Sequence, residues 1–162
     1  MIQMQATFAG FGGGARTLFS AYDPASRVLI IAKDADYREQ RFPGCVVLTN
    51  IDGIPCDSRF TDDDIREAIS AYYALSKGIA ADGKGARLVF DASVMRASPE
   101  TNIERDGIDD RGPKYRIADG ITCVQMAALA TCLHALRADA VDRTVKLAKR
   151  FERLALGEVL TI

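Results

Sequence analysis

The sequence is poor in the residues that most often carry metal or nucleophilic chemistry. Of its 162 residues none is tryptophan and one is histidine, His134. Its four cysteines form no CxxC pair, which removes the usual zinc-binding and redox spacings. A catalytic Cys-His pair would need His134, but Cys132, two residues away, points to a different face of a helix. We therefore expect His134 to be a hydrogen-bonded core or boundary residue and the cysteines to be buried as small apolar side chains.

Excess charge and long apolar runs are also missing. The 21 basic and 22 acidic residues give a net charge of −1, so no global field attracts nucleic acid or anionic lipid. No stretch reaches the roughly 20 apolar residues of a membrane helix. The first ten residues lack the basic region and apolar core of a signal peptide. These absences predict a cytoplasmic protein without membrane contact, and the length predicts a single domain over residues 1–162.

The most distinctive stretch is residues 121–136, which carry no charge in a chain that is 27% charged. Their few polar side chains fall on opposite sides of a helix, which predicts a helix covered on all sides. Asp119 or Gly120 is the expected cap. A second helix is predicted from about Asp139 to Leu156, and a break near residues 137–139 would fold the two helices into a hairpin.

The remaining chain predicts a sheet and one helix. Five segments have the length and composition of strands: residues 2–8, 16–22, 27–33, 45–50 and 86–92. Residues 2–8 alternate apolar and polar side chains, which is typical of a strand with one face in water. Pro24 suits a turn between the second and third strands. A helix over residues 61–77 has a capping threonine, Thr61, and acids in its first turn.

Together these segments predict an α+β fold. It has an antiparallel or mixed sheet of about five strands, one packing helix and the C-terminal helical hairpin. A parallel Rossmann-like α/β arrangement is the alternative, because a glycine-rich turn follows the first strand.

That turn contains Gly10, Gly12, Gly13 and Gly14 in the G-x-G-x-x-A spacing of a dinucleotide-binding loop, with Asp34 further along as a ribose-binding acid. However, the first strand alternates instead of being continuously apolar, and a strand pattern follows the glycines where the cofactor fold needs a helix. A flexible connection between antiparallel strands is therefore the favoured interpretation.

Three acids follow or end apolar strands: Asp34, Asp52 and Asp91. If these ends share one edge of the sheet, their carboxylates could hold Mg²⁺ for phosphoryl chemistry. The competing explanation is that aspartate is common wherever a strand meets a turn.

Residues 93–120 form a long segment rich in charge, with few large apolar side chains. We expect a mobile loop that serves an intermolecular contact, because so few apolar groups do not offset the backbone entropy of ordering it. Its acids would face a basic stripe on the last helix of a neighbouring subunit. The acids are Glu104, Asp106, Asp109 and Asp110, and the stripe is Arg143, Lys146, Arg150 and Arg153.

The same basic face could contact nucleic-acid phosphates, although no aromatic residues interleave with it, and a solvated helix face is favoured. Without a catalytic constellation, the sequence favours a non-enzymatic binding or assembly protein, a homo-oligomer that uses residues 93–120 for contacts. No metal or cofactor is predicted for it. The alternative is a small enzyme acting on a phosphate-bearing ligand, with Mg²⁺ or a nucleotide at the glycine turn or the aspartate edge.

Overall fold

The structure is a computed structural model of the chain. It describes residues 1–10, 14–78 and 85–155, with the backbone alone for residues 142–146 and 153–155. Within these residues the centre is a six-stranded sheet in the order β5-β4-β1-β2-β3-β6. The strands are β1 (Ile2–Ala9), β2 (Ala15–Asp23), β3 (Val28–Asp36), β4 (Cys45–Thr49), β5 (Ser58–Arg59) and β6 (Arg87–Phe90).

The sheet is mixed because β2 is antiparallel to both of its neighbours while all other neighbouring strands pair in parallel. One helix packs on the face of this sheet and a second helix packs on the first, which confirms the α+β class and the mixed sheet. The Rossmann-like alternative is wrong, because β1, β2 and β3 follow one another as an antiparallel meander without a helical crossover.

The turn between β2 and β3 forms where the sequence predicts it. The Asp23 carboxylate accepts a hydrogen bond from the Ala25 amide at 3.0 Å, and the Asp23 carbonyl accepts one from the Arg27 amide at 2.7 Å. Arg27 closes the turn with a φ of 57°. Pro24 follows Asp23, and its ring fixes φ at the second position of the turn, so local sequence determines this connection.

The face of the sheet away from the helices is covered beside β1, which contradicts the expectation of a water-exposed face. Gln5 and Thr7 are both 0% exposed. The side-chain nitrogen of Gln5 donates to the Gln40 carbonyl at 2.9 Å, and its side-chain oxygen accepts from the Phe42 backbone amide at 2.9 Å. The Thr7 hydroxyl donates to the Arg38 carbonyl at 3.1 Å. Alternation therefore identifies two faces of a strand but does not reveal that a later segment satisfies and buries the polar one.

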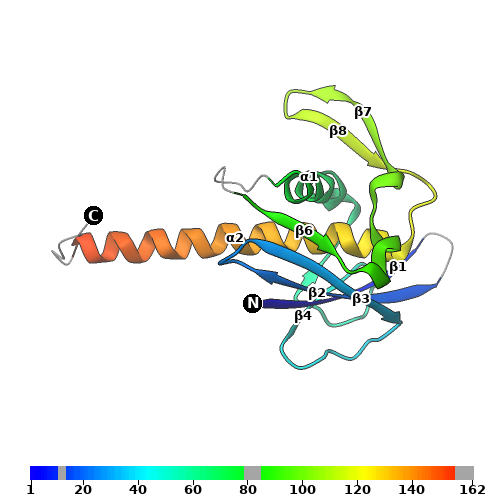
Figure 1. Ribbon diagram of the computed structural model, residues 1–162, viewed down its shortest axis with the longest axis horizontal. Coiled ribbons are helices and arrows are strands. Elements are labelled where there is room, and N and C mark those ends of the chain that lie inside the picture. The colour runs from blue at the N-terminus through cyan, green and yellow to red at the C-terminus, as the bar shows by residue number, and fades with distance from the viewer. Residues whose placement is uncertain (11–13, 79–84, 156–162) are drawn as a thin grey trace.

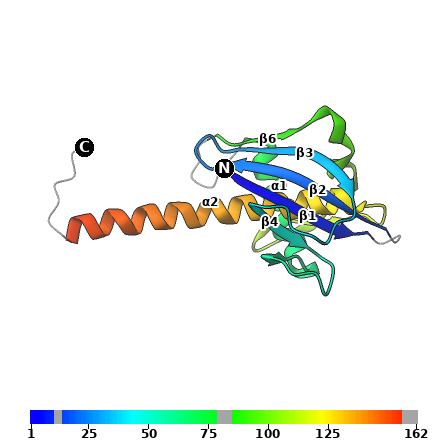
Figure 2. The same ribbon diagram turned by 90° about the horizontal axis from the view of Figure 1, so that it is seen from below.

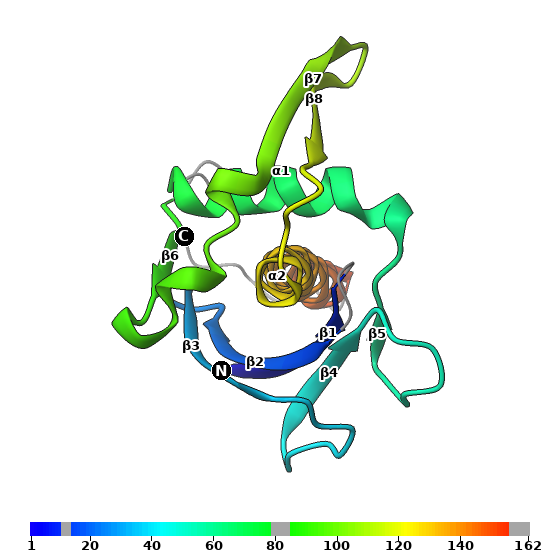
Figure 3. The ribbon, with the colours of Figure 1, turned by 90° about the vertical axis from the view of Figure 1, so that its right-hand side faces the viewer.

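The helices are α1 (Ile65–Ser76) and α2 (Cys123–Ala155). Figure 3 shows the sheet curving around the first part of α2, with α1 on the opposite side of that helix. Ala127, Ala128 and Leu129 are all 0% exposed. The predicted buried helix is therefore confirmed, and it lies between the sheet and α1. No helix in the described part of the chain is long and apolar enough to cross a membrane.

The entry into α1 also follows the prediction. A short 3-10 helix, η1 (Asp62–Asp64), precedes it. The Thr61 amide donates to the Asp64 carboxylate at 2.9 Å, which forms one half of a capping box. Gly78 ends the helical region with a φ of +75°, a conformation that glycine adopts without strain.

The predicted C-terminal helical hairpin is wrong, because α2 is one continuous helix of 33 residues. The polar residues that suggested a break instead have tertiary partners. Arg137 pairs with Glu67 of α1 at 2.9 Å. Asp139 is 3% exposed and accepts a hydrogen bond from the Tyr22 hydroxyl at 3.2 Å. With no glycine or proline from residue 123 to residue 155, nothing in the backbone stops the helix.

Residues 93–120 are not a structureless loop. They contain most of η2 (Ala92–Ala97), then η3 (Glu100–Asn102) and an antiparallel hairpin of β7 (Ile103–Asp109) and β8 (Gly112–Ile117). Ile103, Tyr115 and Ile117 at the base of the hairpin pack against the core, while its tip extends past α1 (Figure 1). The ladder satisfies the backbone locally, so the segment needs few apolar residues to be ordered.

Candidate functional site

The glycine turn connects β1 and β2, and it is partly outside the described residues. Gly12 and Gly13 are not described. The Gly10 amide donates to the Gly14 carbonyl at 3.2 Å, across the mouth of an antiparallel hairpin. Residues 15–23 are a strand, so they supply no helix N-terminus for a pyrophosphate.

A different helix begins beside this turn. A Cβ atom at Gly10 would lie 3.3 Å from the backbone nitrogen of Cys123, the first residue of α2. Glycine at position 10 therefore permits the end of β1 to approach the start of α2 closely. The sequence could not indicate this contact, because the two residues are far apart in the chain.

The N-terminus of α2 is capped by the residue before it, Thr122, and by Gln125 of its first turn. The Thr122 hydroxyl accepts from the Gln125 backbone amide at 3.2 Å, and the Gln125 side-chain oxygen accepts from the Thr122 backbone amide at 2.9 Å. This is a capping box, so the expected caps Asp119 and Gly120 are wrong. The T-x-x-Q spacing before an apolar run was the sequence signal that could have identified it.

Gln125 also ties the helix to the segment before it. Its side-chain oxygen accepts from the Asn102 amide group at 2.8 Å, and its nitrogen donates to the Ser98 carbonyl at 3.0 Å. Gln125 is 6% exposed. One buried amide therefore joins α2 to η2, η3 and the base of the hairpin.

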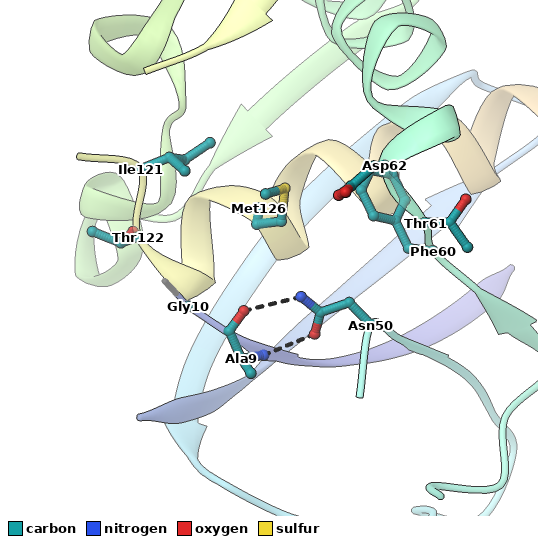
Figure 4. Close-up of a pocket in the computed structure, with 9 residues that line it drawn as sticks. All are labelled: Ala9, Gly10, Asn50, Phe60, Thr61, Asp62, Ile121, Thr122 and Met126. Atoms are coloured by element: carbon teal, nitrogen blue, oxygen red, sulfur yellow. Dashed lines mark hydrogen bonds between the residues drawn. The ribbon is translucent and has the colours of Figure 1, made fainter. Parts of the chain in front are cut away.

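A cavity of about 230 Å³ lies at this end of the molecule, and we call it the α2 cavity (Figure 4). Its lining residues are Ala9, Gly10, Asn50, Phe60, Thr61, Asp62, Ile121, Thr122 and Met126. The Asn50 side chain is held by two hydrogen bonds to the backbone of Ala9, at 2.9 and 3.0 Å.

The α2 cavity combines apolar and acidic lining. Phe60, Ile121 and Met126 supply nearly buried apolar walls, at 8%, 5% and 6% exposure. Asp62 adds an exposed carboxylate. This arrangement suits an apolar group that carries a neighbouring positive charge, since the walls favour apolar contact and the carboxylate favours a cation.

A second hollow of about 420 Å³ lies beside the segment that covers the far face of the sheet. Its aromatic rings already have partners: Phe19 and Phe42 meet edge to face at 5.0 Å, and the Arg38 guanidinium lies 3.9 Å from the Phe42 ring centre. The Tyr37 hydroxyl donates to Glu39 at 2.7 Å. We do not assign a ligand to this hollow.

The three aspartates of the predicted metal edge are not brought together as a site. Asp34 on β3 pairs with Arg16 at 3.4 Å and with Arg96 of η2. Asp91 accepts hydrogen bonds from the Ser93 hydroxyl and amide, which lower the pKa of its carboxyl. Asp52 is exposed in the loop after β4, a strand separated from β3 by β1 and β2. Among the described residues, no group of three or more histidine, cysteine or acidic side chains is placed to hold a metal ion.

His134 and Cys132 do not form a reactive pair. His134 is half-buried, and burial lowers the pKa of its imidazole while nearby Asp57 acts in the opposite direction. Cys132 is fully buried, and burial raises the pKa of its thiol to about 12, so the thiol stays protonated near neutral pH. The predicted burial holds for Cys132, whereas the other three cysteines are half-buried.

The predicted acidic contact surface is partly neutralised within the chain. Glu104 pairs with Arg116 across the hairpin at 2.9 Å. Asp109 is bound by both terminal nitrogens of Arg66 on α1, at 2.6 and 2.7 Å, which holds the pKa of its carboxyl well below the usual range. Asp106 and Asp110 remain exposed. On the basic stripe, Arg150 is exposed, and the side chains of residues 143, 146 and 153 lie outside those described.

The second half of α2 extends beyond the sheet, and we call residues 140–155 the projecting segment (Figures 1 and 2). Val141, Leu147 and Phe151 on this segment are 64%, 52% and 60% exposed. In residues 124–135 of the same helix every side chain except His134 is buried. The helix therefore leaves the core with large apolar side chains in water.

The fold and these features define an α+β protein with a curved mixed sheet wrapped around a long helix. No family model, curated protein sequence or solved structure matches this chain.

Proposed function

We propose that the protein is a non-enzymatic binding or assembly protein that forms a homo-oligomer. The projecting segment and the β7–β8 hairpin are its contact surfaces. The observation that carries this proposal is the exposure of Val141, Leu147 and Phe151 on a helix that nothing covers in the described part of the chain. Large apolar groups gathered on a surface favour burial against a partner.

The hairpin is the second contact surface because its tip extends beyond α1, on the side of α1 that faces away from the sheet (Figure 3). Ile108 is 69% exposed there, next to the exposed acids Asp106 and Asp110. An exposed apolar residue with flanking charges can contribute both area and charge matching to an interface. The paired acids Glu104 and Asp109 instead hold the hairpin together and against α1.

The proposal predicts that the parent protein has a solution mass above the 17.6 kDa of one chain and that Leu147→Asp lowers it. Leu147 is 52% exposed, so the substitution removes apolar contact area and adds a charge without disturbing the core. Light scattering or sedimentation across a range of concentrations measures the mass. Ser70→Asp, on an exposed position of α1, adds the same charge as a control and should leave the mass unchanged. A parent that is a monomer at every concentration contradicts the proposal.

Shortening the hairpin tests the second surface. Replacing residues 106–114 with Asn-Gly joins Arg105 to Tyr115, which already face each other across the ladder, through a two-residue turn. The base contacts of Ile103, Tyr115 and Ile117 stay in place, so we expect a folded protein with weakened assembly. The melting temperature should fall slightly, since the Arg66–Asp109 pair is lost. Arg66→Gln alone removes that pair and keeps the tip, and it should retain assembly. An unchanged mass after shortening would show that the hairpin is not a contact surface.

A ligand-binding enzyme is the competing class, and a thermal-shift screen with nucleotides and divalent ions distinguishes it. A ligand at 100 times its dissociation constant adds about 2.7 kcal/mol of stability to the folded state. A rise of several degrees with one nucleotide or ion would overturn an assembly-only function. We expect no such rise.

A further inference from the structure

We propose that the α2 cavity binds a small organic amine, a molecule that joins an aromatic or branched apolar group to a protonated nitrogen. The apolar group lies against the walls of the cavity, and the ammonium group pairs with the Asp62 carboxylate. This inference goes beyond the proposed function, because it adds a small-molecule site that does not depend on whether the protein forms a homo-oligomer.

The polar side chains around the cavity leave a carboxylate available to a ligand. Three of them are already hydrogen-bonded within the chain: Asn50, Thr61 and Thr122. The fourth is Asp62, and among the described residues its carboxylate has neither a hydrogen-bond nor an ion-pair partner. In Figure 4 its oxygen atoms point towards Met126, another lining residue. The polar end of a bound molecule therefore finds its partner at Asp62.

The charges at this place select a cation. Asp62 is the charged residue among the described lining residues, and Asp63 beside it is a second exposed acid without a partner in the described part of the chain. Asp64 is different, because Arg137 pairs with it at 3.3 Å. Two unpaired carboxylates repel a phosphate or a carboxylate, whereas an ammonium group gains a charge-assisted hydrogen bond.

The walls and the volume determine the rest of the ligand. Phe60, Ile121 and Met126 are nearly buried, so they offer apolar contact to an organic group. A metal ion instead needs several oxygen ligands around it. A cavity of about 150 Å³ holds benzene, so the 230 Å³ of the α2 cavity accommodates a ring with a short chain. Typical sites for larger ligands have roughly 300–1,000 Å³, which disfavours a nucleotide.

The cavity is bounded by fixed elements, so binding requires little rearrangement. The two hydrogen bonds between Asn50 and the Ala9 backbone join the loop after β4 to the end of β1. Gly10 lets that end of β1 approach Cys123, the first residue of α2. A preformed site loses less free energy to the ordering of its side chains, so more of the contact energy appears as affinity.

The test measures the binding of phenethylamine by saturation-transfer NMR, a ligand-observed method that works for monomers and for assemblies. A molecule of this size has a dissociation constant of about 1 mM at ordinary ligand efficiency. The controls are 2-phenylethanol, which is neutral, and 3-phenylpropionate, which is an anion. Both keep the ring and the length of the chain. We expect the amine to bind more tightly than the alcohol, and the alcohol more tightly than the acid.

Two substitutions identify the carboxylate that the amine uses. Asp62→Asn removes the charge and keeps the shape of the side chain, and Asp63→Asn does the same one position away. Both positions are exposed, so both variants should melt like the parent. Asp62→Asn should weaken phenethylamine binding about fivefold, as expected for an ion pair near the surface. It should leave 2-phenylethanol binding unchanged, which shows that the ammonium group and Asp62 are coupled. Asp63→Asn should retain most of the affinity for the amine.

The outcomes separate this site from the proposed assembly. No saturable phenethylamine binding up to roughly ten times the expected dissociation constant overturns the amine site. Equal binding of 3-phenylpropionate also overturns it, and so does an affinity for the amine that Asp62→Asn leaves unchanged or that both variants lower equally. The solution mass of the parent tests the assembly in a separate measurement, so either conclusion can fail while the other stands.

Discussion

Replacing Leu129 with aspartate is expected to abolish folding. Leu129 is 0% exposed and lies in the part of α2 that is enclosed by the sheet and α1 (Figure 3). An unpaired charge in this position costs several kcal/mol, against a total stability of about 5–15 kcal/mol for a domain. The variant should lack a cooperative thermal transition and should accumulate in the insoluble fraction on expression.

The matched control is Leu147→Asp, the same substitution in the same helix. The two leucines are eighteen residues apart, which is about five turns, so they lie on the same face of α2. Leu147 is 52% exposed, and its substitution should leave the melting temperature close to that of the parent. Soluble Leu129→Asp protein that melts cooperatively near the parent temperature would show that this part of α2 is not the core.

Replacing Gln125 with leucine is expected to lower the free energy of unfolding by about 2 to 4 kcal/mol, because buried hydrogen-bonding groups lose their partner. The Thr122 amide, the Asn102 side chain and the Ser98 carbonyl all bond to the Gln125 side chain. Leucine has a similar size but bonds to none of them. Urea denaturation measures the loss.

Gln125→Glu is the informative companion. A carboxylate still accepts from the Thr122 amide and the Asn102 side chain, but it cannot donate to the Ser98 carbonyl. We expect its stability to lie between those of the parent and Gln125→Leu. Hydrogen exchange should show faster exchange in η2, η3 and the base of the hairpin for the leucine variant. If the Gln125→Leu variant is as stable as the parent, the buried Gln125 side chain does not join α2 to η2, η3 and the hairpin.

Local features of the fold could be predicted from the sequence because short-range rules determine them. Asp23 and Pro24 make a turn with their own neighbours, and Thr61 and Asp64 form the predicted start of the α1 region. The uncharged run at residues 121–136 indicates a buried helix, since only a covered helix can be apolar on all sides. The strand β1 follows from its alternation of apolar and polar side chains.

The sequence predictions were wrong where polar side chains form hydrogen bonds or ion pairs with residues far away in the chain. Gln5 and Thr7 resemble solvent-facing positions, yet residues 38–42 bury them with backbone hydrogen bonds. The polar residues Arg137 and Asp139 suggested a break between two helices. Both instead lie within one helix, where Arg137 forms an ion pair with Glu67 and Asp139 accepts a hydrogen bond from Tyr22. The candidate site was missed for the same reason, because the α2 cavity combines residues from four separate stretches of the chain.

The sequence by itself determined the α+β class, the meander of β1 to β3 and the presence of a buried helix, because these follow from local periodicity and turn chemistry. Only the tertiary structure decided how much of α2 is covered. Leu129 and Leu147 have the same residue type on the same helix face, and the sheet and α1 enclose the first and end before the second. Burial depends on which distant elements reach a residue, and that is the physical reason why one leucine belongs to the core and the other to a surface.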